Sequence, residues 1–201
     1  MIKECFKNHD FRVLWGAGGM TGIARAMEFL ALSLYALQEL GLPYLVTIIF
    51  AARMLPMSLL GIIIGTISER ISPLLLIKII YSLSNIFTAT SVILVITNNF
   101  NVYFAFTLAF INGITWVVDL AVRRRVLAEN IKKNLLSSSL AMETLSNNAT
   151  RLIGPLCAGS LYAFVGLSGI FCLQLLMYFF ALGLISVSYT HLSCRRLIAC
   201  R

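Results

Sequence analysis

Two charged residues, Arg25 and Glu28, lie near the middle of a long apolar segment, residues 15–38. A charged side chain at the centre of a bilayer costs about 2.5–3.5 kcal/mol on insertion scales, so a chain that keeps two of them in one segment is expected to use them. Residues three apart share one face of a helix. The pattern predicts an inward-facing site of a transporter, and the alternative is a static internal ion pair that sets helix packing.

Glu28 is the candidate proton-coupling carboxylate of this site. Burial disfavours the carboxylate anion, whereas a neighbouring arginine such as Arg25 favours it. Alternating solvent access would shift that balance and move a proton in each cycle. The predicted ligands are therefore a small-molecule substrate and protons.

Two further arginines lie inside apolar segments. Arg53 is expected to bind an anionic group of the substrate, to neutralise Glu28 or to serve as a structural partner. Arg151 is either a cavity residue or a partner of Asp119 or Glu143, and we favour the structural role. Glu143 itself, near the membrane entry of its segment, is interpreted as an interfacial charge.

The composition is that of a membrane protein. The chain is 59% hydrophobic and only 12% charged, whereas soluble domains carry about 25% charged residues. The five cysteines show neither disulfide nor metal-ligand spacing, and no cleavable signal or catalytic constellation is present, so we expect no enzyme activity, cofactor or metal.

Six apolar segments predict an all-α protein with six transmembrane helices, because some 20 helical residues cross the hydrocarbon core. Trp116 and the aromatic residues of the third, fourth and sixth segments are mostly expected to face lipid or to pack, and the alternative for one of them is a stacking role in a cavity. The fifth segment carries a polar stripe at helical spacing that predicts a cavity lining: Thr144, Asn147, Arg151, Gly154 and Ala158. The segments are residues 15–38, 44–67, 74–97, 102–122, 140–164 and 169–187.

The charges in the loops predict the orientation. Turn residues end three hairpins at Gly41, at Asn98 and at Gly166, and these connections carry no charge. Apart from Arg25, Arg53 and Arg151, every lysine and arginine lies on the opposite side. The positive-inside rule then places both termini in the cytoplasm of a bacterial cell, with the bundle in the inner membrane. The net charge of +8 is thus a topology signal and not a nucleic-acid site.

The sequence pattern of the last residues differs from that of the rest of the chain. The segment 186–201 lacks clear periodicity, and its SYTHL stretch resembles a translated sequencing-adapter scar. We therefore expect a cytoplasmic segment at 1–14, a bundle at 15–187 and a non-native or irregular tail at 188–201, in a chain that is a fragment.

Small residues mark places where helices could approach closely in lipid. Gly18-x-x-x-Gly22 is one such pattern and Gly61-x-x-x-Gly65 is another. The second continues into Glu69-Arg70 at the end of its segment, so that GIIIGTISER resembles the loop motif of the major facilitator superfamily. The glycine and basic residue that usually follow are replaced by Ser72, Pro73 and Leu74.

Two more segments carry the resemblance. DLAVRRRVLAEN, with Asp119 and Arg123, is similar to the D-x-P-x-R segment of enterobactin and macrolide exporters, and its i,i+4 spacing lets the two residues pair with each other or with Arg70. NATRLIGPLCAG is similar to the N-x-x-R-x-x-G-P-x-x-x-G segment of the fifth span. Its matching residues predict a helix bend: Asn148, Arg151, Gly154, Pro155 and Gly159.

The resemblance covers about residues 11–187. It implies the N-terminal six-helix half of a twelve-helix transporter, whose partner is a missing C-terminal half and whose substrate path runs between the halves. The expected function is proton-coupled efflux of small molecules, of drug or siderophore type. The alternatives are an uptake permease of the same fold and a six-helix non-transporting membrane scaffold, and a second six-span half downstream in the gene would favour transport.

Overall fold

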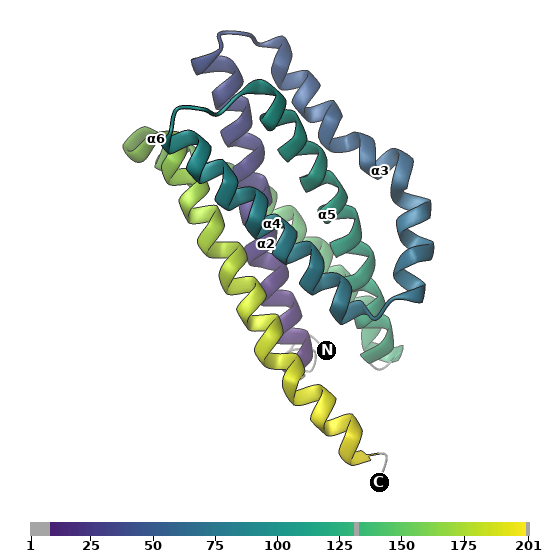
Figure 1. The fold of residues 1–201 in the computed structure, drawn as a ribbon. Helices are drawn as coiled ribbons and strands as arrows, with labels where there is room; N and C mark the ends of the chain where they lie inside the picture. The colour runs from purple at the N-terminus through teal and green to yellow at the C-terminus, as the bar shows by residue number, and fades with distance from the viewer. Residues whose placement is uncertain (1–8, 131–132, 200–201) are drawn as a thin grey trace.

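The computed structural model describes residues 9–130 and 133–199, and in these ranges the chain forms helices joined by short turns, without a strand. The first helix, α2 (His9–Leu34), runs into a π-helical turn, η1 (Tyr35–Glu39). The others are α3 (Tyr44–Arg70), α4 (Pro73–Ile96), α5 (Val102–Asn130) and α6 (Lys133–Ala199). Figure 1 shows them as one bundle, with the two ends of the chain at the same end of it.

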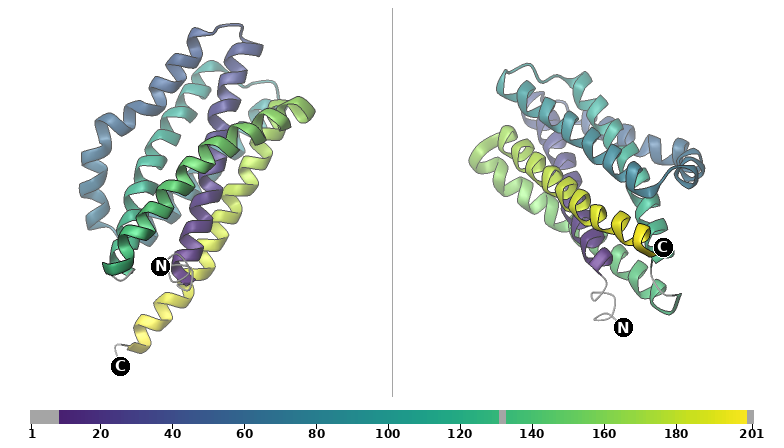
Figure 2. Two further views of the ribbon diagram at one scale, coloured as in Figure 1. Left: turned by 180° about the vertical axis from the view of Figure 1, so that it is seen from behind. Right: turned by 60° about the horizontal axis from the view of Figure 1, so that its bottom comes forward.

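Helix α6 consists of two antiparallel arms. Gly166 has a non-helical backbone (φ 71°, ψ −162°), a conformation that glycine adopts without a steric cost. Figure 2 shows the chain reversing there, so that the second arm returns along the bundle. Among the described residues, five helices are long and apolar enough to cross a membrane, and the last of these stretches, Leu135–Ser186, has 52 residues, enough for two crossings. The predicted all-α membrane fold is confirmed, and the two arms of α6 bring the helical segments close to the expected six.

The other two predicted turns are also present. Gly41 (φ 64°) and Asn98 (φ 55°) both have left-handed backbones between helices. The predicted segments fall on the helices, but the helices extend further at the charged ends of α2, α3 and α5. Hydropathy marks only the stretch in hydrocarbon, whereas helical hydrogen bonding continues beyond it. The chain also stays helical through Ala199, where an irregular tail was expected.

Helix α3 lies at the outside of the bundle. It packs mainly on α5, while α6 packs on α2 and α4. Its outer face exposes large apolar side chains such as Leu59, at 64%, as expected of a surface that meets lipid. Pro56 lies inside the helix, where it removes a backbone donor, and α3 changes direction partway along its length in Figure 1.

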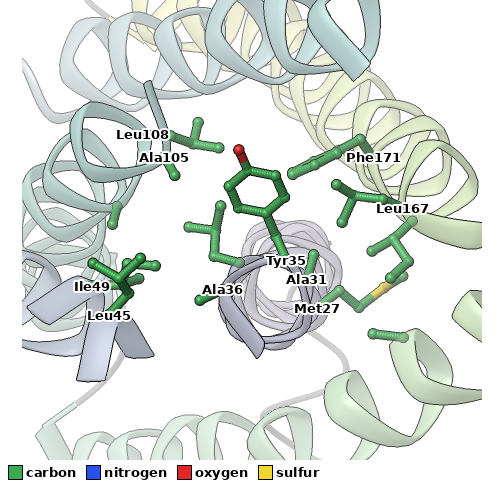
Figure 3. Close-up of a cluster of buried hydrophobic side chains, with 14 residues drawn as sticks. Met27, Ala31, Tyr35, Ala36, Leu45, Ile49, Ala105, Leu108, Leu167 and Phe171 are labelled. Carbon is green, nitrogen blue, oxygen red and sulfur yellow. The ribbon is translucent and has the colours of Figure 1, made fainter. Parts of the chain in front are cut away.

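Two apolar clusters fill the bundle, one toward each end of α2. The first surrounds Met27, Ala31 and Tyr35, with side chains from α3, α5 and the second arm of α6 arranged around α2 (Figure 3). The second cluster gathers Phe11, Leu14 and residues of α4, α5 and α6 nearer the ends of the chain. The polar residues of α2, from Thr21 to Glu28, lie between these clusters and are buried with them.

Glycines set the close approach of α2 to its neighbours. A Cβ at Gly154 would collide with Ala26 and with the carbonyl of Ile23, and a Cβ at Gly22 would collide with Thr150. The prediction of close packing is therefore confirmed at Gly22. It is wrong at Gly61, where nothing lies within 4 Å of a Cβ, because the outlying half of α3 leaves that face open.

Candidate functional site

Arg25 and Glu28 both point into the bundle, with only 5% and 2% of their surfaces exposed. They do not pair with each other. Arg25 binds Asp119 of α5, and Glu28 accepts a hydrogen bond from Gln174 in the second arm of α6. The inward orientation predicted from the sequence is thus confirmed, but each residue belongs to a different polar group.

Arg25 anchors a buried charge network with Asp119 at its centre. The Arg25 Nη2 atom lies 2.5 Å from Asp119 Oδ2 and 2.9 Å from the hydroxyl of Thr21. The hydroxyl of Tyr81, on α4, donates to the other oxygen of Asp119 at 2.9 Å. One carboxylate therefore joins α2, α4 and α5, and a buried charge is tolerated because it is paired and hydrogen-bonded.

Arg123 extends this network toward the first arm of α6. It lies 3.7 Å from Asp119, one turn earlier on α5, and 3.0 Å from Glu143. It also donates to the side chain of Asn147 at 3.3 Å. A Cβ on Gly18 would overlap its guanidinium, so this glycine makes room for Arg123 beside α2.

The network tests two expectations. The predicted pairing of Asp119 with Arg123 is confirmed. The interpretation of Glu143 as an interfacial charge is wrong, because the side chain is buried against Arg123. The remaining residues of the predicted gating motif lie outside the described side chains: Gly65, Glu69 and Arg70.

Glu28 has neutral polar groups as its nearest side-chain neighbours, with the guanidinium of Arg53 acting on it at longer range. Gln174 Nε2 donates to its Oε2 at 2.5 Å. Tyr178, one turn after Gln174, is buried, and so is Asn112 of α5. The Tyr178 hydroxyl and the Asn112 amide bond no described residue. Glu28 forms no ion pair within 4 Å with a described cation, and this separates it from Asp119.

A small cleft opens beside the buried network. It has a volume of about 50 Å³ and lies between α2, α3, α5 and the first arm of α6. Arg53 donates to the Arg25 carbonyl at 3.1 Å, and its guanidinium carbon is 5.5 Å from the ring centres of Phe29 and Trp116. The guanidinium carbon of Arg151 lies 5.1 Å from the centre of the same Trp116 ring.

The positions of Arg151 and Trp116 in the cleft differ from the roles that were favoured from the sequence. Arg151 lines the cleft and pairs with neither Asp119 nor Glu143, so the favoured structural pairing is wrong. For Trp116 the lipid-facing or packing role was favoured over stacking in a cavity, yet its ring lines the cleft within 5.5 Å of two guanidinium carbons. Arg53 donates to a backbone carbonyl and lies over two rings. It forms no ion pair with Glu28 within 4 Å, yet it is the charged group that acts most strongly on that carboxylate, so the predicted neutralisation of Glu28 is retained at longer range.

The polar stripe predicted on the fifth segment is divided between two roles. Asn147 and Arg151 line the cleft, whereas Gly154 and Ala158 are buried in contact with α2 and the core, and Thr144 is exposed. Asn148 is exposed, and Pro155 lies within the continuous first arm of α6. The bend expected from Gly154, Pro155 and Gly159 stays a prediction.

Sequence reasoning did not identify Thr21, Tyr81 or Gln174 as site residues. All three are polar residues within apolar segments, at 0%, 1% and 0% exposure. Their burial could have been suspected, because polar groups in hydrocarbon need partners. Their hydrogen-bond partners depend on how the helices are arranged in space. The periodicity of the sequence does not predict that arrangement. Among the described residues, no group of three or more histidine, cysteine or acidic side chains could hold a metal ion.

Comparison with known proteins gives one match. A family model described as transmembrane secretion effector matches residues 4–199. No curated protein and no solved structure matched the chain. The match covers all the helices that form the network and the cleft.

Proposed function

The chain belongs to the transmembrane secretion effector family of major facilitator transporters, and on this premise we propose that it is the N-terminal six-helix half of a proton-coupled exporter of small molecules. Membership of the family makes it a multi-pass membrane transporter. Export, proton coupling and the site residues are the proposal. The location in a bacterial inner membrane is also part of the proposal, as is the cytoplasmic position of both termini, which the basic loops support.

The observation that carries the proposal is the contrast between two buried carboxylates. Asp119 is within ion-pair distance of Arg25 and Arg123, so its charge has counter-charges close by. Glu28 is held by the neutral amide of Gln174. Protonating a carboxylate that lies between guanidiniums would break close ion pairs in a buried interior, whereas protonating Glu28 breaks no ion pair within 4 Å and removes only the longer-range interaction with Arg53. Glu28 is therefore the group suited to exchange a proton.

In the proposed cycle, the bundle rocks against a second half and exposes the interior to each side in turn. Glu28 takes a proton when it faces the side of higher proton activity and keeps it while the interior is closed. It releases the proton on the other side, where water stabilises the carboxylate again. The substrate occupies the path between the halves in the opposite step.

The test is Glu28→Gln in the complete protein, reconstituted in vesicles with an imposed proton gradient. The amide keeps the size of the side chain but cannot ionise, so gradient-driven transport should be abolished while insertion and folding are retained. Glu39→Gln is the matched control, because Glu39 is exposed in η1 at the end of the same helix. Unchanged transport by Glu28→Gln would remove Glu28 from the mechanism.

The same vesicles determine the direction of transport. Export predicts that substrate and protons move in opposite directions, whereas movement in the same direction would identify an uptake permease. A protein that inserts and folds but moves no compound in either direction would support the scaffold interpretation.

A further inference from the structure

The cleft between Arg53, Trp116 and Arg151 has the chemistry of an anion site. Two guanidinium groups approach one indole ring, at 5.5 Å and 5.1 Å from its centre. We propose that this cleft binds an anionic head group of the transported molecule, a carboxylate or a similar oxyanion. The inference rests on the proposed transport function and adds a substrate class to it.

The charge balance around the cleft supports this assignment. Among the described residues, no carboxylate lies within 4 Å of Arg53 or Arg151, whereas Arg25 and Arg123 in the neighbouring network both have one. Cations at membrane depth are costly without a counter-charge. The ring faces offset part of that cost, and Glu28 acts on Arg53 at longer range. A bound oxyanion would supply a close counter-charge to both guanidiniums.

The guanidinium groups also have donors to offer. Arg53 uses one nitrogen, Nη1, on the Arg25 carbonyl. An arginine carries five N–H donors in a planar fork that matches the two oxygens of a carboxylate. Both guanidinium carbons lie within 5.5 Å of the Trp116 ring centre, and a cation–π contact uses none of the N–H donors as a hydrogen bond.

The size of the cleft limits the ligand to its head group. A volume of about 50 Å³ has room for a few water-sized groups and not for a whole drug molecule. Gly22 and Ala26 line the cleft with small residues from α2. Asn147 and Thr150 line it with polar side chains from α6. The rest of the transported molecule would extend out of the cleft into the path between the halves.

The experiment measures equilibrium binding of radiolabelled benzoate to the purified complete protein, with benzamide as a neutral probe of the same shape. Benzoate should bind more tightly than benzamide, because only benzoate supplies a charge. Arg53→Gln and Arg151→Gln should each weaken benzoate binding by about tenfold or more, the usual effect of losing a hydrogen bond to a charged group. Arg151→Lys should keep part of the affinity, since it keeps the charge but loses the fork.

The matched control is Arg124→Gln, which removes an exposed arginine from the helix that carries Trp116. It should bind benzoate like the unmodified protein. Thermal unfolding of each variant shows that it is folded. Equal binding of benzoate and benzamide, no binding of benzoate, or unchanged affinity in both cleft variants would overturn the proposal.

The two proposals fail in different ways. Loss of transport in Glu28→Gln together with no benzoate binding would remove the anion site and leave proton-coupled transport standing. Arginine-dependent benzoate binding together with unchanged transport in Glu28→Gln would keep the anion site and remove proton coupling through Glu28.

Discussion

The four described arginines of the bundle interior fall into two regions. Arg25 and Arg123 lie in a closed network with Asp119 and Glu143, and both are at most 5% exposed. Arg53 and Arg151 lie in an open cleft, against aromatic rings and a carbonyl oxygen. The two regions are adjacent, and Arg25 belongs to both, through its guanidinium in the first and its backbone in the second.

The difference shows how the same residue type takes different roles at the same depth in a membrane. An arginine whose partners are carboxylates of other helices fixes the arrangement of those helices. An arginine whose partners are ring faces keeps its N–H donors available to a ligand. We infer that the network holds the bundle together and that the cleft recognises the substrate, and the following variants separate these roles by their effect on stability.

The largest loss of stability is expected for Asp119→Asn. The amide keeps a partner for Tyr81 but leaves two buried guanidiniums without their shared counter-charge, and breaking a buried pair in this way costs about 3–5 kcal/mol. Thermal unfolding in detergent measures it. Glu129→Gln, on the same helix, removes an exposed pair with Arg125 and should cost no more than about 1 kcal/mol. Equal losses in the two variants would contradict a structural role of the network.

An intermediate loss is expected for Gly18→Ala. The new methyl group would occupy the space of the Arg123 guanidinium, and that group can move only by leaving Asp119 and Glu143. Overpacking of this kind costs about 1–3 kcal/mol. Gly16→Ala is the control on the same helix, since nothing lies within 4 Å of a Cβ there. A Gly18→Ala variant as stable as Gly16→Ala would show that Arg123 is not held in place.

The smallest loss is expected for Arg151→Gln. The side chain is exposed, and its described partner is the Trp116 ring. An exposed cation–π contact is worth about 0.5–1 kcal/mol, so unfolding should change little while anion binding is lost. A loss as large as that of Asp119→Asn would place Arg151 with the structural residues and remove the distinction between the two regions.

Much of the fold could be predicted from the sequence because hydrocarbon imposes simple rules. Segment length, hydropathy and the turn residues Gly41, Asn98 and Gly166 gave the six crossings and the places where the chain reverses. The charges of Arg25 and Glu28 predicted that both would face inward, because lipid would not accept them. The pairing of Asp119 with Arg123 followed from their spacing along one helix.

The pairings between helices could not be predicted in the same way. Arg25 meets Asp119 and Glu28 meets Gln174 only because α2 packs against α5 and the second arm of α6. The rotation of each helix about its axis decides these contacts, and apolar segments with polar residues on several faces leave that rotation open. For the same reason, Glu143 was assigned to the membrane interface and Trp116 to lipid or packing in preference to a cavity, although the structure buries the first and places the second in the cleft.

The central claim is that the charged residues of the spans face the interior of the bundle and its cleft, which is open to water at Arg151, and not the lipid. Cysteine labelling tests it most directly, in a background where the native cysteines are replaced by serine. A membrane-impermeant, charged thiol reagent is applied to membranes carrying Arg151→Cys or Leu152→Cys. These neighbouring residues are both exposed, but residue 151 lines the cleft and residue 152 is a 72% exposed apolar side chain. The reagent reacts with thiolate, which forms in water and not in hydrocarbon. We predict rapid labelling at position 151 and little at position 152, whereas equal labelling, or protection at position 151, would contradict the account.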